Sequence, residues 1–190
     1  MDWRRALAIG VLTFFVAVAF ALPSRRATDT LDLLSATLIL GVIILIGIAF
    51  DVVGVAAAAA SEKPFHAMAA SDRPGARQAI WIVRNADAVA SFCNDVVGDV
   101  AGTLSGAAGA AIVVRLLAFR PGVDQTVMSV LMVGLVAALT VGGKAAGKGF
   151  ALSRSTTIVY AAARVLHILE KTGLVRLQLR RSRRPARDVN

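Results

Sequence analysis

The sequence has one cysteine, two histidines and few charged residues, and these scarcities narrow the class of protein. Cys93 has no second cysteine in the chain with which to form a disulfide, and the histidines are too scattered to suggest a haem, iron–sulfur or zinc site. Charged residues make up only 17% of the sequence, against roughly 25% in an average soluble domain. No nucleophile–base pair or metal-ligand cluster is visible, so we do not expect an enzyme.

The sequence is instead rich in hydrophobic residues. Hydrophobic residues make up 57% of the 190 residues, more than a soluble domain of this size could bury. The formal charge of +9 clusters outside the apolar runs without interleaved aromatic residues, so we expect the lipid bilayer as a partner and no nucleic acid. The expected fold class is all-α: a polytopic membrane protein with about four transmembrane helices and cytoplasmic interfacial amphipathic helices.

Four apolar runs predict the membrane spans, because each approaches or exceeds the length that crosses a ~30 Å hydrocarbon core. They are residues 6–22, 31–60, 88–119 and 127–141. The first could also be a signal peptide cleaved near Ala21, but it is long for a signal sequence, so we favour a retained helix. The turn residues 120–124 introduce the last run.

Basic residues predict the orientation of these spans. Of the 21 Lys and Arg residues, 17 lie in the N-terminus, in residues 61–87 and from Lys144 onward. The positive-inside rule places these segments in the cytoplasm. We therefore expect a multi-pass protein of the cell membrane with both termini cytoplasmic.

Two segments outside the spans have the spacing of amphipathic helices. Residues 62–85 predict two short interfacial helices, broken at residues 72–75 and anchored by Trp81. Residues 153–169 predict another, with Gly173 as its C-cap. The basic tail 173–190 carries six arginines. We expect it either to lie on anionic lipid headgroups or to be disordered. Its arginines could also serve only to fix the topology.

Charged side chains at membrane depth define the candidate site, because each costs about 2.5–3.5 kcal/mol to insert and needs a partner or a polar cavity. The candidates for an ion site or charge cluster are Asp51, Asn94, Asp95, Asp99, Lys144 and Lys148. Asp95 and Asp99 are four residues apart and share one helical face, where two carboxylates require a nearby cation. That cation is either a metal ion or Lys144.

Glycines around Lys144 predict a break in the last apolar helix. Gly142, Gly143 and Gly147 are poor helix formers, and irregular backbone at membrane depth is typical of transporter ion sites. The alternative is an ordinary interfacial helix end with snorkelling lysines.

Small residues at four-residue spacing in the third run permit close helix packing. Ala101 and Ser105 form one such pair, and Gly102 and Gly106 form another. They are suited to packing inside the bundle or to a seam between two copies of the chain.

The order of these parts resembles the transmembrane domain of the CNNM/CorC family, which is linked to magnesium and cobalt efflux. The resemblance rests on Asp51-Val52-Val53-Gly54, Gly75 to Ile80, Asn85-Ala86-Asp87, Gly98 to Thr103 and Lys144 to Lys148. It implies three spans, a pair of cytoplasmic helices after the first and an amphipathic belt helix after the last. These parts cover residues 31–172, so residues 1–30 would be an additional N-terminal transmembrane helix and loop.

The resemblance also implies a cation site, with Asp51 and Asp99 as metal-binding positions and magnesium as the first ion to consider. A lysine at position 144, where the family has a glutamate, reverses the local charge and works against a divalent cation. The family's nucleotide-binding CBS domains have no counterpart here.

Two functions therefore remain open. One is cation transport through a homodimer, with a cavity lined by Asp51, Asp95, Asp99 and Lys144. The other is a non-transporting membrane partner or regulatory subunit, in which an Asp–Lys cluster replaces the ion and a separate cytoplasmic partner carries the missing domains.

Overall fold

The computed structural model describes residues 3–30, 32–119 and 122–172, and across these residues its regular structure is entirely helical. The helices in chain order are α1 (Trp3–Thr30), α2 (Leu33–Ala59), α3 (Lys63–Ala70), α4 (Ala76–Arg84), α5 (Ala86–Ser91), the π-helix η1 (Phe92–Gly98), α6 (Asp99–Phe119), α7 (Gln125–Ser153) and α8 (Ser155–Lys171). The basic tail 173–190, with the predicted cap Gly173, lies outside these residues.

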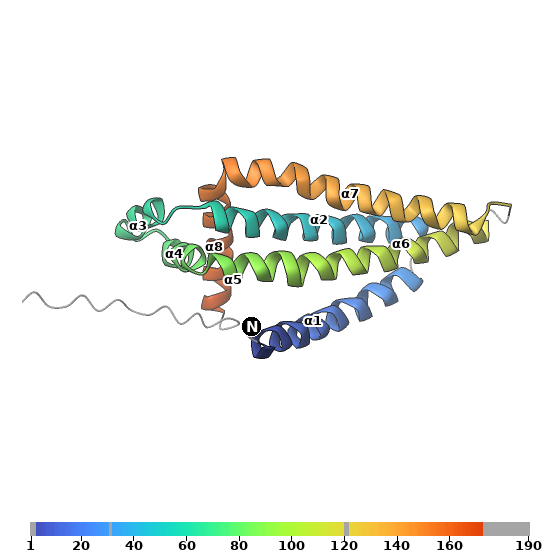
Figure 1. Ribbon diagram of the computed structural model, residues 1–190, viewed down its shortest axis with the longest axis horizontal. Helices are drawn as coiled ribbons and strands as arrows, with labels where there is room; N and C mark the ends of the chain where they lie inside the picture. Colours follow the sequence, from blue (N-terminus) through green and yellow to red (C-terminus); the bar gives the residue numbers. More distant parts are fainter. Residues whose placement is uncertain (1–2, 31, 120–121, 173–190) are drawn as a thin grey trace, which may run out of the picture.

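Three long helical rods form the body of the molecule (Figure 1). They are α2, the continuous run α5–η1–α6, and α7, and each is long and apolar enough to cross a membrane. Helix α2 lies at the centre, because it contacts η1, α6 and α7. The apolar residues of α2 surround its whole circumference, which suits a helix that faces protein on one side and lipid on the other.

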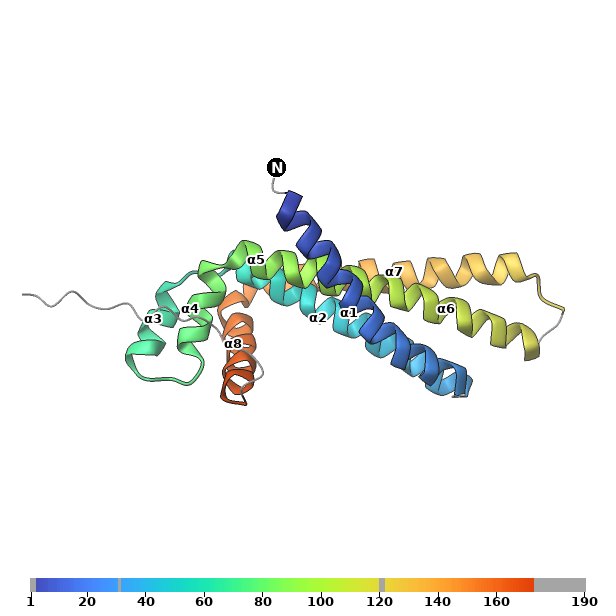
Figure 2. The same cartoon turned by 90° about the horizontal axis from the view of Figure 1, so that it is seen from below.

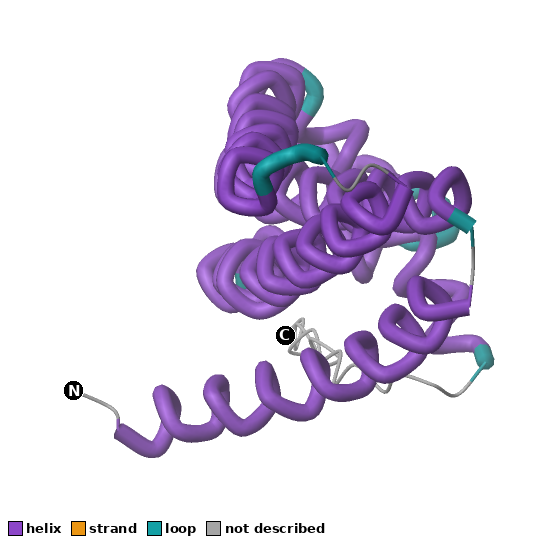
Figure 3. The backbone as a smooth tube through the Cα atoms, turned by 90° about the vertical axis from the view of Figure 1, so that its right-hand side faces the viewer, coloured by secondary structure: helices purple, strands orange, loops and turns teal. Residues whose placement is uncertain are grey.

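Helix α1 crosses α6 obliquely and diverges from the other rods toward its N-terminus (Figures 2 and 3). We expected the first apolar run to end at Pro23, but the helix continues to Thr30. A proline removes one backbone hydrogen bond and can bend a helix without ending it. Within the described residues of α1, the apolar stretch is the shorter segment Ile9–Ala19.

The short helices gather at one end of the rods, which we name the α8 end, where α8 lies across the bundle (Figure 1). As predicted, residues 72–75 separate α3 from α4, with Asp72 and Gly75 at positive φ. A side chain on Gly75 would lie 3.2 Å from the backbone of Arg164, so only glycine lets this turn pack onto α8. The Tyr160 hydroxyl donates a hydrogen bond of 3.2 Å to the Pro74 carbonyl and fixes the same contact.

Two apolar clusters hold these parts together. One joins the end of α2 to α3, α4 and α8 around the fully buried Phe65, Ile82 and Val159. The other lies between α2, α6 and α7. Only 6% of the apolar window of α7 is buried, so in a bilayer this helix is covered mainly by lipid.

Candidate functional site

A buried carboxylate interrupts the apolar surface of α2. Asp51 is 6% exposed and belongs to the face of α2 that packs against η1, α6 and α7. A carboxylate in such surroundings is unfavourable unless a positive charge or hydrogen-bond donors compensate it. The residues around Asp51 therefore define the candidate site.

Lys144 of α7 supplies the positive charge. Its Nζ atom lies 3.8 Å from Asp51 Oδ1, and its side chain is 24% exposed. This separation makes an ion pair but is too long for a hydrogen bond. We expected either a metal ion or Lys144 to neutralise Asp95 and Asp99; the charge partner of Lys144 in the structure is Asp51.

Glycines bring Lys144 to this position, and they do not break the helix. Helix α7 runs without interruption from Gln125 to Ser153, so the predicted break at Gly142, Gly143 and Gly147 is wrong. A side chain on Gly143 would collide with Ile48, and one on Gly147 would lie 2.6 Å from Val52 Cγ2. Their absence lets α7 approach α2 closely, and this packing offsets the low helix propensity of glycine. Gly142 has open space around it.

The π-helix η1 forms the third side of the site. A side chain on Gly54 of α2 would lie 2.6 Å from Asn94 Oδ1, so the Asn94 amide occupies the space that this glycine leaves free. Gly98 of η1 likewise leaves space for the Lys144 ammonium group, because a side chain at position 98 would lie 3.2 Å from Lys144 Nζ. The site therefore depends on two glycines, one on α2 and one on η1.

Two oxygen atoms at this site are buried without a hydrogen-bond partner. They are Asp51 Oδ2 and Asn94 Oδ1. Buried polar atoms in folded proteins nearly always have partners, so unpartnered acceptors indicate room for a donor, a water molecule or a cation. Together with the ion pair, they give the site one carboxylate, one amide oxygen and one ammonium group.

These groups do not fit a magnesium site. Mg²⁺ requires near-octahedral coordination by oxygen, whereas the site offers oxygens from two side chains beside the Lys144 ammonium group. In the part of the chain that the structure describes, no three His, Cys, Asp or Glu residues are grouped as metal ligands.

The remaining predicted site residues lie outside the cluster. Asp95, Asp99 and Lys148 are exposed. The Ser91 hydroxyl donates a hydrogen bond of 2.6 Å to Asp95 Oδ2. Asp99 is the first residue of α6, and a metal site formed by Asp51 and Asp99 together stays a prediction.

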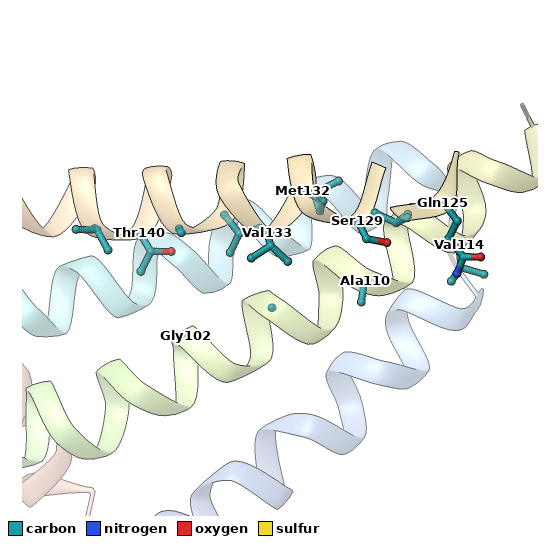
Figure 4. A pocket seen from close by; sticks show the side chains of 13 residues that line it. Gly102, Ala110, Val114, Gln125, Ser129, Met132, Val133 and Thr140 are labelled. Atoms are coloured by element: carbon teal, nitrogen blue, oxygen red, sulfur yellow. The ribbon is translucent and has the colours of Figure 1, made fainter. Parts of the chain in front are cut away.

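The two pairs of small residues in α6 take different positions. Ala101 and Ser105 are buried, and Ala101 packs against Gly47 of α2. Gly102 and Gly106 instead face a groove between α6 and α7 of about 430 Å³ (Figure 4). The groove is lined by Gly102, Gly106, Ala110, Val113, Val114, Gln125, Ser129, Met132, Val133, Val136, Ala137, Thr140 and Val141.

A second buried polar contact, which sequence reasoning missed, ties α4 to α8. The Gln78 side chain is 5% exposed, and its Nε2 atom donates to Glu170 Oε2 at 2.7 Å. The same nitrogen lies 3.2 Å from Nδ1 of His167. This contact fixes α4 against α8 at the α8 end of the rods.

Comparisons with protein-family models, with curated proteins and with solved structures found no match for the chain. The resemblance to the CNNM/CorC transmembrane domain therefore stays a prediction.

Proposed function

We propose that this chain is a membrane transporter of singly charged cations, and that the Asp51 carboxylate and the Asn94 amide oxygen form its binding site. The observation that carries the proposal is the pair of buried, unpartnered oxygens beside the Lys144 ammonium. Ionisable groups at membrane depth commonly mark ion or proton pathways, because their cost of insertion needs a compensating function.

The position of Asp51 along α2 places the site at one boundary of the proposed membrane. From Leu33 to Phe50, α2 has roughly 18 uncharged residues, or about 27 Å of helix, close to the thickness of the hydrocarbon core. Asp51 follows directly, so it stands at the boundary nearest the α8 end. In the topology that we propose, α1 adds a fourth span, both termini are cytoplasmic, and this boundary is the cytoplasmic one.

Lys144 acts in this mechanism as an internal competitor. A cation that binds Asp51 Oδ2 and Asn94 Oδ1 replaces the ammonium group as the counter-charge of Asp51. The lysine side chain is 24% exposed and has a flexible stem, so its charge can move outward when the cation enters. Return of the ammonium group then expels the cation, which makes binding reversible.

The experiment is a flux measurement with purified protein in liposomes. Sodium and proton uptake are followed with ion-sensitive dyes, and the wild-type protein should move at least one of the two. Asp51→Asn should abolish the flux, whereas Asp87→Asn, which removes an exposed carboxylate on α5, should leave it unchanged. Wild-type liposomes that are no more permeable than empty ones would refute the proposal.

The ion pair itself favours a second candidate function, a non-transporting membrane partner or regulatory subunit. At 3.8 Å, Lys144 already neutralises Asp51, so the pair could serve only to hold α7 against α2. This alternative predicts no flux, together with full stability when both charges are replaced by apolar side chains of similar size.

A further inference from the structure

The π-helix η1 lies within a rod that is otherwise α-helical, and it carries two residues of the site. Asn94 and Gly98 both belong to η1, between α5 and α6. A π-turn bonds residue i to i+5, so it holds one residue more than an α-turn. If such a turn becomes α-helical, the segment on one side of it rotates by about one residue position.

The packing on the two sides of η1 determines which segment can rotate. Helix α6 is anchored, because seven of its residues are buried in the bundle. Helix α5 has no buried residue, and Asn85 separates it from α4. Rotation of α5 therefore shifts only partly buried side chains such as Val89 along α2, whereas rotation of α6 would displace seven buried residues.

We propose that η1 alternates between a π-turn and an α-turn, and that this change replaces Asn94 by Asp95 at the site; the inference rests on the proposed cation transport. With α6 fixed, Asn94 faces the site in the π-turn, five positions before Asp99. In an α-turn, the residue four positions before Asp99 takes that place. That residue is Asp95, whose carboxylate is exposed and accepts the Ser91 hydrogen bond in the π form.

The exchange changes the charge of the site by one unit. In the π form, Asp51 and Lys144 cancel each other beside a neutral amide. In the α form, before Lys144 moves outward, two carboxylates face one ammonium group, and the net charge of minus one attracts one singly charged cation. Because the cation binds the α form more tightly, it shifts η1 toward that form, so binding and conformational change are coupled. Asp95 thereby becomes the residue that determines how much charge the site accepts.

The first test compares Asp95→Asn with Asp99→Asn, two isosteric changes on exposed carboxylates one turn apart. Sodium binding to purified protein and sodium or proton uptake by liposomes are both measured. Asp95→Asn should weaken cation binding at least tenfold, whereas Asp99→Asn should change it less than twofold. If the two variants weakened cation binding equally, or if neither weakened it, the inference would be overturned.

A second measurement reports on η1 directly and needs no substitution. Amide hydrogen exchange of the wild-type protein is compared with and without sodium, at constant ionic strength. Sodium should change the exchange of residues 86–98 and leave α6 unchanged, because only the segment before α6 rotates. An unchanged pattern in protein that binds sodium would refute the register change and leave the proposed transport intact. Protein that neither binds nor moves a cation would overturn both.

Discussion

At the scale of single residues, the Asp51 carboxylate and the groups that compensate it dominate the energetics of the site. Its presence could be predicted, because one acidic residue in an otherwise uncharged run stands out in the sequence. The partner of Asp51 could not be predicted, because Lys144 lies far along the chain and because Asp95 and Asp99 were equally plausible partners for that lysine. Only the close packing of α7 on α2 at Gly143 and Gly147 decides the pairing.

Removal of one charge should destabilise the protein more than removal of both. Lys144→Met leaves the Asp51 carboxylate, whose side chain is 8% exposed, without its partner, and we expect a loss of about 3–5 kcal/mol. The double variant Asp51→Leu, Lys144→Met replaces the pair by apolar groups and should recover most of that loss. Thermal unfolding in detergent measures both effects, and equal melting temperatures for the single and double variants would contradict this view.

The glycine beside Asn94 should tolerate no side chain. In Gly54→Ala, the new methyl group would lie 2.6 Å from Asn94 Oδ1 and 3.1 Å from Cys93 Cβ, so η1 would have to move away from α2. We expect a destabilisation of about 1–3 kcal/mol and weaker cation binding. Gly102→Ala is the matched control, because open space surrounds that position and alanine has the higher helix propensity. A Gly54→Ala protein as stable as the control would show that the contact is unimportant.

At the scale of helices, the surface elements could be predicted better than those in the bundle. The hairpin of α3 and α4 follows from amphipathic spacing and a turn that contains Pro74 and Gly75, both of which are local signals. The π-turn could not be predicted, because it has no composition of its own and depends on packing against α2. The same packing keeps α7 helical through its glycines, where helix propensity alone predicts a break.

The α3–α4 hairpin should loosen in acid. The pKa of Glu62 lies below its ordinary value of 4.5, because its carboxylate accepts a hydrogen bond from His66 and, second, one from Arg84. A lowered pKa in the folded state means that this stabilisation is present above the ordinary value and is lost as the pH falls through the lowered one. Amide exchange of residues 63–70 should therefore rise below about pH 4.5, relative to the intrinsic rate.

Glu62→Gln provides the control for this pH dependence. Glutamine has no charge to lose, so the variant should show faster exchange in α3 at neutral pH and a weaker change on acidification. An identical pH profile for the variant and the wild-type protein would assign the acid response to another group.

At the scale of the whole molecule, the bilayer replaces part of the core. Helix α7 buries little of its apolar surface against protein, and a groove of about 430 Å³ lies between α6 and α7 (Figure 4). The two apolar clusters join α2 to its neighbours but leave the outer faces of the rods to lipid. A membrane, or a detergent that imitates one, would cover these apolar faces.

The proposed orientation can be tested by labelling single cysteines in intact cells. Cys93→Ser removes the native thiol, and Ser71→Cys and Val123→Cys then place one exposed thiol near each end of the rods. A membrane-impermeant maleimide should label position 123 in intact cells and position 71 only after the membrane is permeabilised. The opposite pattern would invert the topology and place the site near the outer boundary.

The order in which the charged pair is synthesised has a consequence for assembly. Asp51 enters the membrane with α2, whereas Lys144 arrives only after 92 further residues have been added. At roughly 5–20 residues per second, the carboxylate waits about 5–20 seconds for its counter-charge. In the proposed topology, Asp51 waits during that interval at the headgroup boundary without its counter-charge. A chain truncated before α7 never supplies that charge, so it should be degraded rather than retained.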